Sequence, residues 1–369
     1  MANTIIHIAP NLSCGAGDLG ISLGGLLEAS PAVGMDPVLI TLDQGGSMAQ
    51  GVEHLRASSP EVDRVLEGAQ AMHLHGLDMG AAKQWSRRAR RHGLPCVISP
   101  LGRWTDPADQ ARTPLAKLRA RFGSNKWMAR ALAVTAINQA EADALRGALP
   151  TASVRRLPLG LDTDRYAAST APADAVNPGD YPSPPVGRIA LVLAPLDPGE
   201  GCAALLRAFA ELGLATEGWG VVLAGPDRGG FGKVLEAGVR RKGGSDRVLI
   251  TSAPDIATQT SWLRRASLLI APAQRHRPPT SILQAAAMGV PVLATSLTAP
   301  PELAEALTLC SPERIDIKEA LRGRLACSKA ELAKSGQELR ERCLQTCDWK
   351  VLVGQYAELY ESARQPVNA

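Results

Sequence analysis

Aromatic residues and long apolar runs are both scarce in this chain of 369 residues. Six Trp, four Tyr and three Phe are too few for a stacking platform that would bind single-stranded nucleic acid. No run reaches the ~20 apolar residues of a membrane-spanning helix. The first residues, MANTIIHIAPNLSCG, lack the basic and apolar regions of a signal peptide. The seven cysteines are scattered without a CxxC pair, which favours free thiols in a reducing compartment. We therefore expect a cytoplasmic protein.

Charge of one sign is also lacking, because the formal net charge is only +4. That value gives no reason to expect a nucleic-acid partner. With 45% hydrophobic and 21% charged residues, the chain has the composition of a globular protein rather than a disordered one. Its length predicts roughly two domains.

Short, continuously apolar runs alternate with helix-length stretches, as expected of strands that are buried on both faces of parallel sheets. The predicted strands of the first half are 4–9, 37–43, 71–77, 96–102, 133–138 and 154–160, and those of the second half are 188–196, 219–227, 247–253, 267–272, 291–295 and 307–310. Two sets of six predict an α/β chain with two Rossmann-like, doubly wound domains.

The join between the two sets is rich in proline. Residues 167–187 contain five prolines and almost no apolar periodicity, which is typical of a linker. We therefore predict a domain over 1–166, a linker over 167–187, a domain over 188–345 and a final amphipathic helix over 346–369. Ligands of such folds bind beyond the carboxyl ends of the strands, so a cleft between facing domains is the expected site.

A glycine-rich loop follows the first predicted strand. Gly15 to Gly20 match GxGxxG, and Asp43 stands 23 residues further on, as in a dinucleotide site. However, Pro10 to Cys14 separate the strand from the first glycine and lengthen the loop. A dinucleotide site is one interpretation; a loop in which Gly15 and Gly17 bind a substrate through backbone amides is the other.

Two histidines flank Leu74 on the third predicted strand. His73 and His75 face the same side because they are two residues apart, so they could meet at the strand end. Either one faces the core and the other lies at an edge, or His75 has a role in binding. Because no third ligand stands nearby in the sequence, no metal is expected.

A basic strip crosses the first half of the chain. Residues 87–130 hold eleven Lys or Arg against two Asp. Leu115, Leu118 and Phe122 give part of it an apolar stripe, as in a helix on an anionic membrane surface. A solvated basic face is the alternative.

The second half carries a candidate anion site. Leu223 to Asp227 end a strand in a glycine turn, and Pro279, Thr280 and Ser281 mark a helix start. Free amides at a helix start favour a diphosphate, and Arg275 and Arg277 would add charge. The alternative is a capped surface helix with solvated arginines.

These patterns together resemble the retaining, nucleotide-sugar-dependent GT-B glycosyltransferases of group 1 (family 4). The segments that carry the resemblance are Val97–Pro100, Asn138–Ala142, Leu157–Asp162, Ala194–Gly201, Ala224–Asp227, Leu283–Thr295 and the helix at Trp349. The resemblance implies two Rossmann-like domains, hexosyl transfer from a nucleoside diphosphate sugar, and a last helix that crosses back to the first domain.

The residues that hold the donor in that family are replaced here. Its Arg and Lys in the loop that opens the second domain correspond to Pro195 and Glu200. Its two glutamates correspond to His276 and Gln284, its histidine to Leu101, and the Asn of its pre-linker turn to Leu159. Because preorganised cations stabilise a leaving diphosphate, either Arg275 and Arg277 take over this role or the donor does not react.

Three functions follow as hypotheses. The first is a glycosyltransferase of envelope or exopolysaccharide synthesis, at most peripheral to the inner membrane face, with a glycan or lipid-linked acceptor, no cofactor and no metal. Its donor residues would be Arg275, Arg277, Thr280, Ser281, Gln284, Gly225 and Asp227, with His276 a candidate catalytic side chain; its acceptor residues would be Gly15, Gly17, His75 and Arg103. The second is a non-catalytic binding or scaffolding relative, and the third a dinucleotide-binding enzyme.

Overall fold

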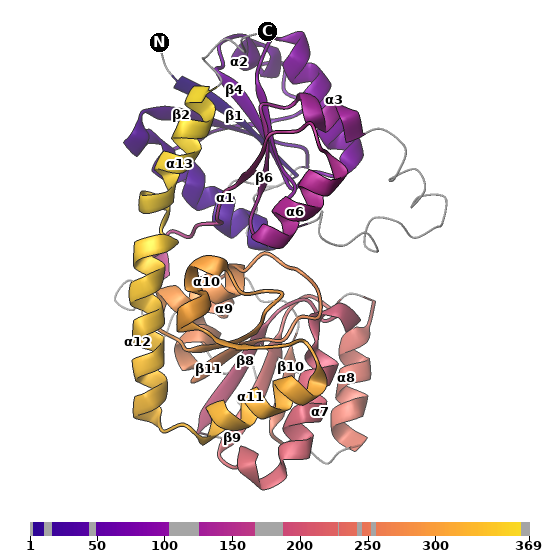
Figure 1. Cartoon of the computed structure of the whole chain (residues 1–369), viewed down its shortest axis with the longest axis vertical. Coiled ribbons are helices and arrows are strands. Elements are labelled where there is room, and N and C mark those ends of the chain that lie inside the picture. Colours follow the sequence, from indigo (N-terminus) through magenta and orange to yellow (C-terminus); the bar gives the residue numbers. More distant parts are fainter. Residues whose placement is uncertain are drawn as a thin grey trace. The chain divides into compact units, whose positions relative to one another are not determined.

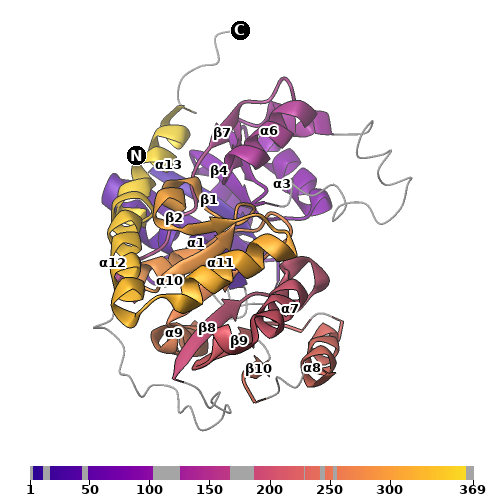
Figure 2. The same ribbon diagram turned by 60° about the horizontal axis from the view of Figure 1, so that its bottom comes forward.

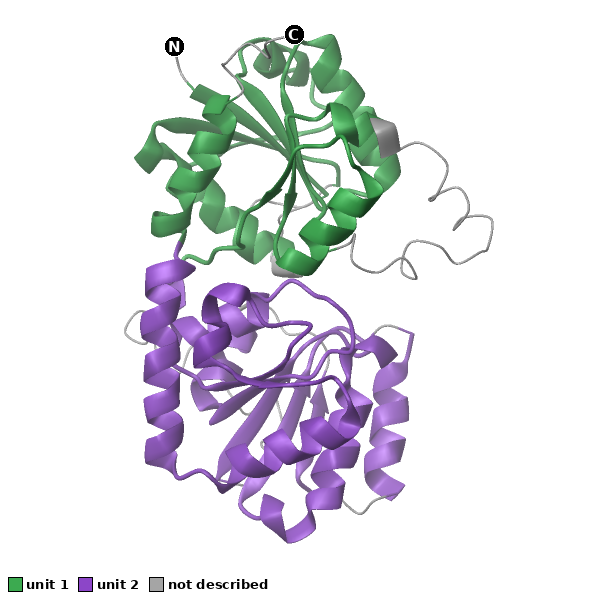
Figure 3. Cartoon of the chain, in the orientation of Figure 1, with its two compact units in different colours: residues 1–162, 349–369 green, residues 163–348 purple. Residues whose placement is uncertain are grey.

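The computed structural model describes residues 3–10, 17–43, 49–102, 125–166, 187–227, 229–241, 246–251 and 256–362. Gly15, Arg103, the predicted basic helix around 115–122 and the linker up to residue 186 lie outside these ranges. The chain divides into unit 1, residues 1–162 and 349–369, and unit 2, residues 163–348 (Figure 3). The sequence predicts that the first domain ends at residue 166 and that the final helix begins at residue 346, whereas the division in the structure falls after residue 162 and before residue 349.

Unit 1 is built on a parallel sheet in the order β3-β2-β1-β4-β5-β6-β7 (Figure 1). Its strands are β1 (Asn3–Ala9), β2 (Met35–Thr41), β3 (Glu53–Arg56), β4 (Ala71–His75), β5 (Cys96–Ser99), β6 (Ala133–Ala136) and β7 (Val154–Arg156). Its helices are α1 (Gly17–Ala29), η1 (Ser30–Val33), α2 (Val62–Glu67), α3 (Met79–Arg91), η2 (Asn125–Arg130), α6 (Gln139–Ala148) and α13 (Trp349–Glu361).

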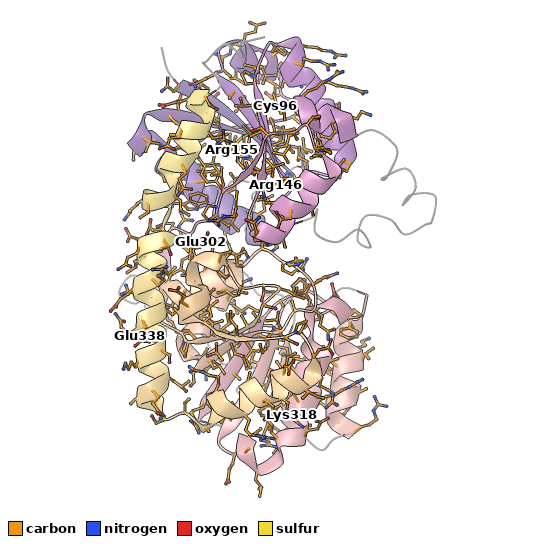
Figure 4. All side chains as sticks on the ribbon, in the orientation of Figure 1. Cys96, Arg146, Arg155, Glu302, Lys318 and Glu338 are labelled. Atoms are coloured by element: carbon orange, nitrogen blue, oxygen red, sulfur yellow. The ribbon has the colours of Figure 1, made fainter. Side chains whose placement is uncertain are left out.

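Helices cover both faces of this sheet. Alternate residues of β1 show the two layers, because Ile6 and Ile8 pack with α2, α3 and α6, whereas Ile5 and Ala9 pack with α1 and α13. Continuously apolar strands therefore follow from burial on both sides. Cys96, which Figure 4 labels in unit 1, begins β5 and is also buried in this core.

Unit 2 repeats the plan with a parallel sheet in the order β10-β9-β8-β11-β12-β13, of which Figure 2 labels β8, β9 and β10. Its strands are β8 (Arg188–Leu193), β9 (Trp219–Ala224), β10 (Val248–Thr251), β11 (Leu268–Ala271), β12 (Val292–Thr295) and β13 (Thr308–Cys310). Its helices are η3 (Asp164–Tyr166), η5 (Pro198–Glu200), α7 (Cys202–Leu212), η6 (Gly213–Thr216), α8 (Phe231–Arg241), α9 (Ile256–Arg265), α10 (Thr280–Ala287), η7 (Pro301–Ala306), α11 (Arg314–Ala326) and α12 (Lys329–Thr346).

All twelve predicted strands are present, and the predicted α/β fold is confirmed. The thirteenth, β3, was not predicted. Its sequence, EHLR, has no apolar run, because it is an edge strand with no fully buried residue. A strand of this kind carries little of the signal that marks a buried one.

The last helix packs on unit 1 through a wedge of tryptophan. A Cβ on Gly25 or on Gly160 would overlap the Trp349 ring, so both glycines make room for the indole. The Trp349 amide donates to the Leu161 carbonyl (3.0 Å), and the Tyr356 hydroxyl donates to Pro158 (3.2 Å). The apolar stripe of this helix buries Leu352, Tyr356, Leu359 and Tyr360. Val351, whose spacing in the sequence predicts a place in the same stripe, is 51% exposed and lies outside it.

None of the helices in the described ranges has the length and apolar character needed to cross a bilayer.

Candidate functional site

In unit 2, the carboxyl ends of the strands meet at a topological switch point between β8 and β11. The chain leaves β8 toward β9 on one side, and β11 leads to β12 on the other. Loops that diverge in this way leave room for a ligand beyond the sheet edge. The loops after β8 and β11, residues 194–201 and 272–279, flank this point.

Close backbone approach joins these loops. A Cβ on Gly201 would overlap the carbonyl oxygen of Pro272, and one on Gly225 would overlap that of Ala194. Gly201 also has a φ of 72°, in the left-handed region that favours glycine. The Gln274 amide donates to the Gly199 carbonyl (3.0 Å). The loops after β8, β9 and β11 therefore form one packed layer.

Both candidate arginines are engaged by acids of the loop after β8. Arg275 Nη2 donates to Asp197 Oδ2 (2.6 Å) and to Glu200 Oε1 (2.9 Å). Arg277 Nη2 lies 2.8 Å from the same Glu200 oxygen. The Glu200 side chain is only 2% exposed, against 20% and 23% for the arginines. Two carboxylates thus offset two guanidinium charges where the resemblance implies a basic loop.

Helix α10 begins at Thr280, as predicted, with Pro279 as its N-cap. Neither Pro279 nor Thr280 is exposed to a significant degree, whereas Ser281 is half-buried. The Thr280 hydroxyl is fully buried and has no hydrogen-bond partner among the described residues. Amides in the first turn of a helix have no partner within it, so this end of α10 can receive an anion.

The remaining donor candidates have partners inside unit 2. His276 Nδ1 donates to the Leu297 carbonyl (3.1 Å), which leaves Nε2 as the acceptor nitrogen. Gln284 is 2% exposed, and its Nε2 donates to the Tyr166 hydroxyl (3.3 Å). Asp227 Oδ1 accepts from the Gly232 amide (3.1 Å) at the start of α8. Their binding roles stay predictions.

In unit 1, the loop after β5 is held in an uncommon conformation. Leu101 has a φ of 57°, which costs of order 1–3 kcal/mol for a residue other than glycine. The next amide, that of Gly102, donates to the buried carboxylate of Glu141 (2.8 Å), whose other oxygen accepts from Ile137 (3.0 Å). Hydrogen bonds to Glu141 thus hold the backbone at Leu101, the position that the sequence resemblance aligns with a family histidine.

The predicted pair of histidines is part of a larger buried group. His73 and His75 have ring centroids 3.8 Å apart, and His75 Nε2 lies 2.9 Å from His7 Nδ1 on β1. Both predicted histidines are buried on one face, so the interpretation with one at an edge is wrong. His75 is 3% exposed, and its acceptor role stays a prediction.

Burial sets the protonation of this group. Loss of solvent lowers the pKa of His7 to about 3 and, with the neighbouring imidazoles, holds the pKa values of His73 and His75 well below 6.5. All three rings are therefore neutral at physiological pH.

Of the two glycines predicted to bind the acceptor, Gly17 is the first residue of α1.

The sequence interpretation missed several residues that shape these edges: Asp197, Tyr166, Glu141 and His7. Two of them had a readable signal. Asp197 precedes Pro-Gly-Glu, a pattern typical of a capped turn, and Glu141 stands three residues after Asn138, which caps α6. His7 and Tyr166 had none, because their partners lie 68 and 118 positions away.

Comparisons with known proteins bear on the fold and on the sequence pattern of unit 2. Residues 187–322 match the family model for glycosyl transferases group 1. The chain is similar to sucrose-phosphate synthase from Thermosynechococcus elongatus, with 18% identity, a TM-score of 0.74, and coverage of 97% of this chain and 98% of that one. It is also similar to Anabaena Alr3699/HepE in complex with UDP and glucose, with 18% identity, a TM-score of 0.76, and coverage of 97% of this chain and 99% of that one. No curated protein sequence matches.

A third similar structure is the UDP-forming α,α-trehalose-phosphate synthase from Burkholderia xenovorans, with 13% identity, a TM-score of 0.69, and coverage of 99% and 100%. Likeness over nearly the full length of each chain identifies the two-unit architecture. The chain therefore has the GT-B glycosyltransferase fold, and its second unit carries the sequence pattern of the group 1 glycosyltransferases.

Proposed function

We propose that this protein is a glycosyltransferase that moves a hexose from a nucleoside diphosphate sugar to a glycan or lipid-linked acceptor of envelope or exopolysaccharide synthesis. The proposal rests on the candidate diphosphate-binding site, here called the donor seat, at the carboxyl ends of the strands of the unit 2 sheet. There the first turn of α10, with Thr280 and Ser281, adjoins the arginine loop at a switch point. Named structural relatives contain UDP and UDP-glucose, which favours a uridine nucleotide as the first ligand to test.

The electrostatics of this seat make its diphosphate affinity modest. Asp197 and Glu200 compete with the ligand for the arginines. A guanidinium carries five N–H donors, so Arg275 and Arg277 can each bind a phosphate oxygen while keeping a carboxylate contact. The α10 amides supply the rest without a metal. Gln284 would turn from Tyr166 to a ribose hydroxyl, Gly225 and Asp227 would line the nucleotide pocket, and His276 Nε2 would accept a hydrogen bond from the sugar.

Acceptor recognition belongs to unit 1 in this proposal, through Gly15, Gly17, His75 and Arg103. Helix α3 adds exposed Arg87, Arg90 and Arg91, while Arg88 pairs with Asp63 (2.7 Å). Exposed cations of this kind favour peripheral contact with an anionic bilayer, where a lipid-linked acceptor would be found.

A second candidate function rests on the same ion pairs. A protein that binds a nucleotide sugar without transferring it needs no strong stabilisation of a leaving diphosphate. The offset charges of Glu200 and Arg277, and Leu101 in place of a histidine, favour such a binding subunit.

Calorimetric titration with UDP, GDP and UDP-glucose tests both candidates. We expect one nucleoside diphosphate to bind each chain, with affinity about 100-fold weaker in the double variant Arg275→Ala, Arg277→Ala, since each charge-assisted hydrogen bond contributes about 1.5–3 kcal/mol. The matched control is Arg314→Ala, Arg322→Ala, which removes two exposed arginines of α11. No binding of any nucleotide by the folded protein contradicts the proposal. Transfer of labelled glucose to a lipid extract separates the enzyme from the binding subunit.

A further inference from the structure

Three histidines from two strands meet inside unit 1. The parallel register pairs His7 of β1 with His73 of β4, and His75 follows two residues later on the same face of the sheet. Their exposed fractions are 0%, 0% and 3%. One ring nitrogen of each lies within 4.8 Å of one nitrogen of both others. Strand register, and not a flexible loop, therefore fixes the positions of all three.

We propose that His7, His73 and His75 bind a divalent transition-metal ion of the zinc class. Imidazole nitrogen suits Zn²⁺, Ni²⁺, Cu²⁺ and Fe²⁺, whereas Mg²⁺ and Ca²⁺ prefer oxygen ligands. Nitrogens bound to tetrahedral zinc at 2.0–2.1 Å stand about 3.4 Å apart. The separations in the cluster are close enough for small side-chain rotations to reach this geometry.

An unsatisfied nitrogen provides independent support. His7 Nε2 is buried and has no hydrogen-bond partner among the described residues, and a buried polar atom without a partner is unfavourable. The other nitrogen, Nδ1, lies 2.9 Å from His75 Nε2. Only one of these two facing nitrogens can donate a proton to the other. A bound ion would either take the place of that proton or satisfy Nε2.

Hydroxyl groups surround the cluster and orient His73. Its Nδ1 lies 2.6 Å from the Tyr360 hydroxyl, and its Nε2 lies 2.6 Å from Ser99 Oγ, which in turn bonds Thr135. On binding, His73 exchanges one hydroxyl for the ion and keeps the other as the outer contact that holds a ligating imidazole in place. Tyr360 belongs to α13, so the site would link the C-terminal helix to the sheet.

Three neutral ligands leave a fourth position and the full charge of the ion. A water or hydroxide, or an anionic group of a substrate, completes the coordination in three-histidine sites of this kind. The ion of this site is separate from the donor seat, whose residues all belong to unit 2. The inference therefore stands or falls independently of nucleotide binding.

The test is a titration of the tag-free, chelator-treated full chain with Co²⁺ and then Zn²⁺. We expect one ion per chain, visible absorption bands typical of tetrahedral cobalt that disappear when zinc is added, and a rise in Tm with Zn²⁺ concentration. His7→Gln or His75→Gln should raise the Kd at least 100-fold, and Tyr360→Phe about tenfold. The matched control is His92→Gln, at the end of α3, which should leave the Kd unchanged.

X-ray absorption at the zinc edge of the wild-type protein decides the matter even where a variant fails to fold, because it counts imidazole ligands directly. Three imidazoles support the proposal. Absence of stoichiometric binding to folded protein overturns it, and so does equal affinity in His7→Gln and His92→Gln.

Discussion

The two units share one strand plan but place their polar groups in different layers. In unit 1, His7, His73 and Ser99 lie within the sheet, on the face covered by α1 and α13, and are at most 4% exposed. In unit 2, apolar side chains such as Val192 and Ile270 line the face covered by α7 and α11, and none of the described strands of this unit carries a histidine.

Unit 2 instead keeps its charged groups in the loops beyond the strands, where Glu200 meets Arg275 and Arg277. This is the usual arrangement for a parallel sheet buried on both faces. The polar layer of unit 1 is costly unless its groups are paired or ligated. One topology therefore supplies two kinds of candidate site, one in the loops and one inside the sheet.

The largest expected effect is that of acidification, which should destabilise the fold of unit 1 before that of unit 2. Burial lowers the pKa of His7 to about 3 and those of His73 and His75 well below 6.5. Between these values the unfolded chain binds more protons than the folded one, so stability present above pH 6.5 is lost as the pH falls toward 3. His7 contributes about 1.4 kcal/mol per pH unit in this window, and the lowered pKa values of His73 and His75 act in the same direction.

The measurement is hydrogen exchange by mass spectrometry on chelator-treated protein at pH 7 and pH 5, corrected for intrinsic exchange rates. Protection of β1 and β4 should fall, while that of β8 and β11 stays. Equal loss of protection in both sheets would contradict the contrast between the units.

Removing the tryptophan wedge should be the next largest effect. Trp349→Ala leaves a cavity between α1 and the turn at Gly160 and should reduce the free energy of unfolding by about 3–5 kcal/mol. Urea denaturation followed by circular dichroism measures this. Val351→Ala, at an exposed position of the same helix, should change stability by less than about 0.5 kcal/mol.

The stability of unit 2 should be sensitive to a side chain added at Gly201, where the loops after β8 and β11 approach each other closely. Gly201→Ala places a Cβ against Pro272 at a φ of 72°, whereas Gly34→Ala, in the same left-handed conformation with a φ of 76°, meets no atom within 4 Å. We expect about 1 kcal/mol of destabilisation at Gly34 from the left-handed conformation alone, and about 2 kcal/mol more at Gly201 from the overlap. Thermal unfolding compares the two variants, and equal losses would show that the loops have room to separate.

The smallest effect concerns Asp227, which caps α8 through Gly232. Asp227→Asn keeps the cap acceptor, while Asp227→Ala loses about 1 kcal/mol. If Asp227 also lines the nucleotide pocket, Asp227→Ala weakens UDP binding as well. A titration with unchanged UDP affinity would restrict this residue to a capping role.

Much of this arrangement could be predicted from the sequence, because it depends on local signals. Apolar runs located the twelve strands, and Pro279 marked the start of α10. The contacts between site residues could not be predicted from local signals, because they join residues that are far apart in the sequence. Arg275 pairs with Asp197 78 positions away, and His7 meets His75 68 positions away. Only the parallel pairing of strands that are distant in sequence brings these groups together.

The partners of Arg275 and Arg277 could not be predicted from the sequence. The sequence suggested that Arg275 and Arg277 supply the charge missing at Pro195 and Glu200. In the structure, Glu200 itself engages both arginines. The replaced residue is therefore part of the candidate anion seat and restrains its charge.

The most direct test of the account is the affinity of UDP for Glu200→Gln, measured by calorimetry beside the wild type. The amide keeps the shape and a hydrogen bond but removes the charge that competes for Arg275 and Arg277. We expect Glu200→Gln to bind UDP about tenfold more tightly at low salt, with the difference shrinking as ionic strength rises. Weaker or unchanged binding by folded Glu200→Gln would contradict the claim that these arginines form the diphosphate seat.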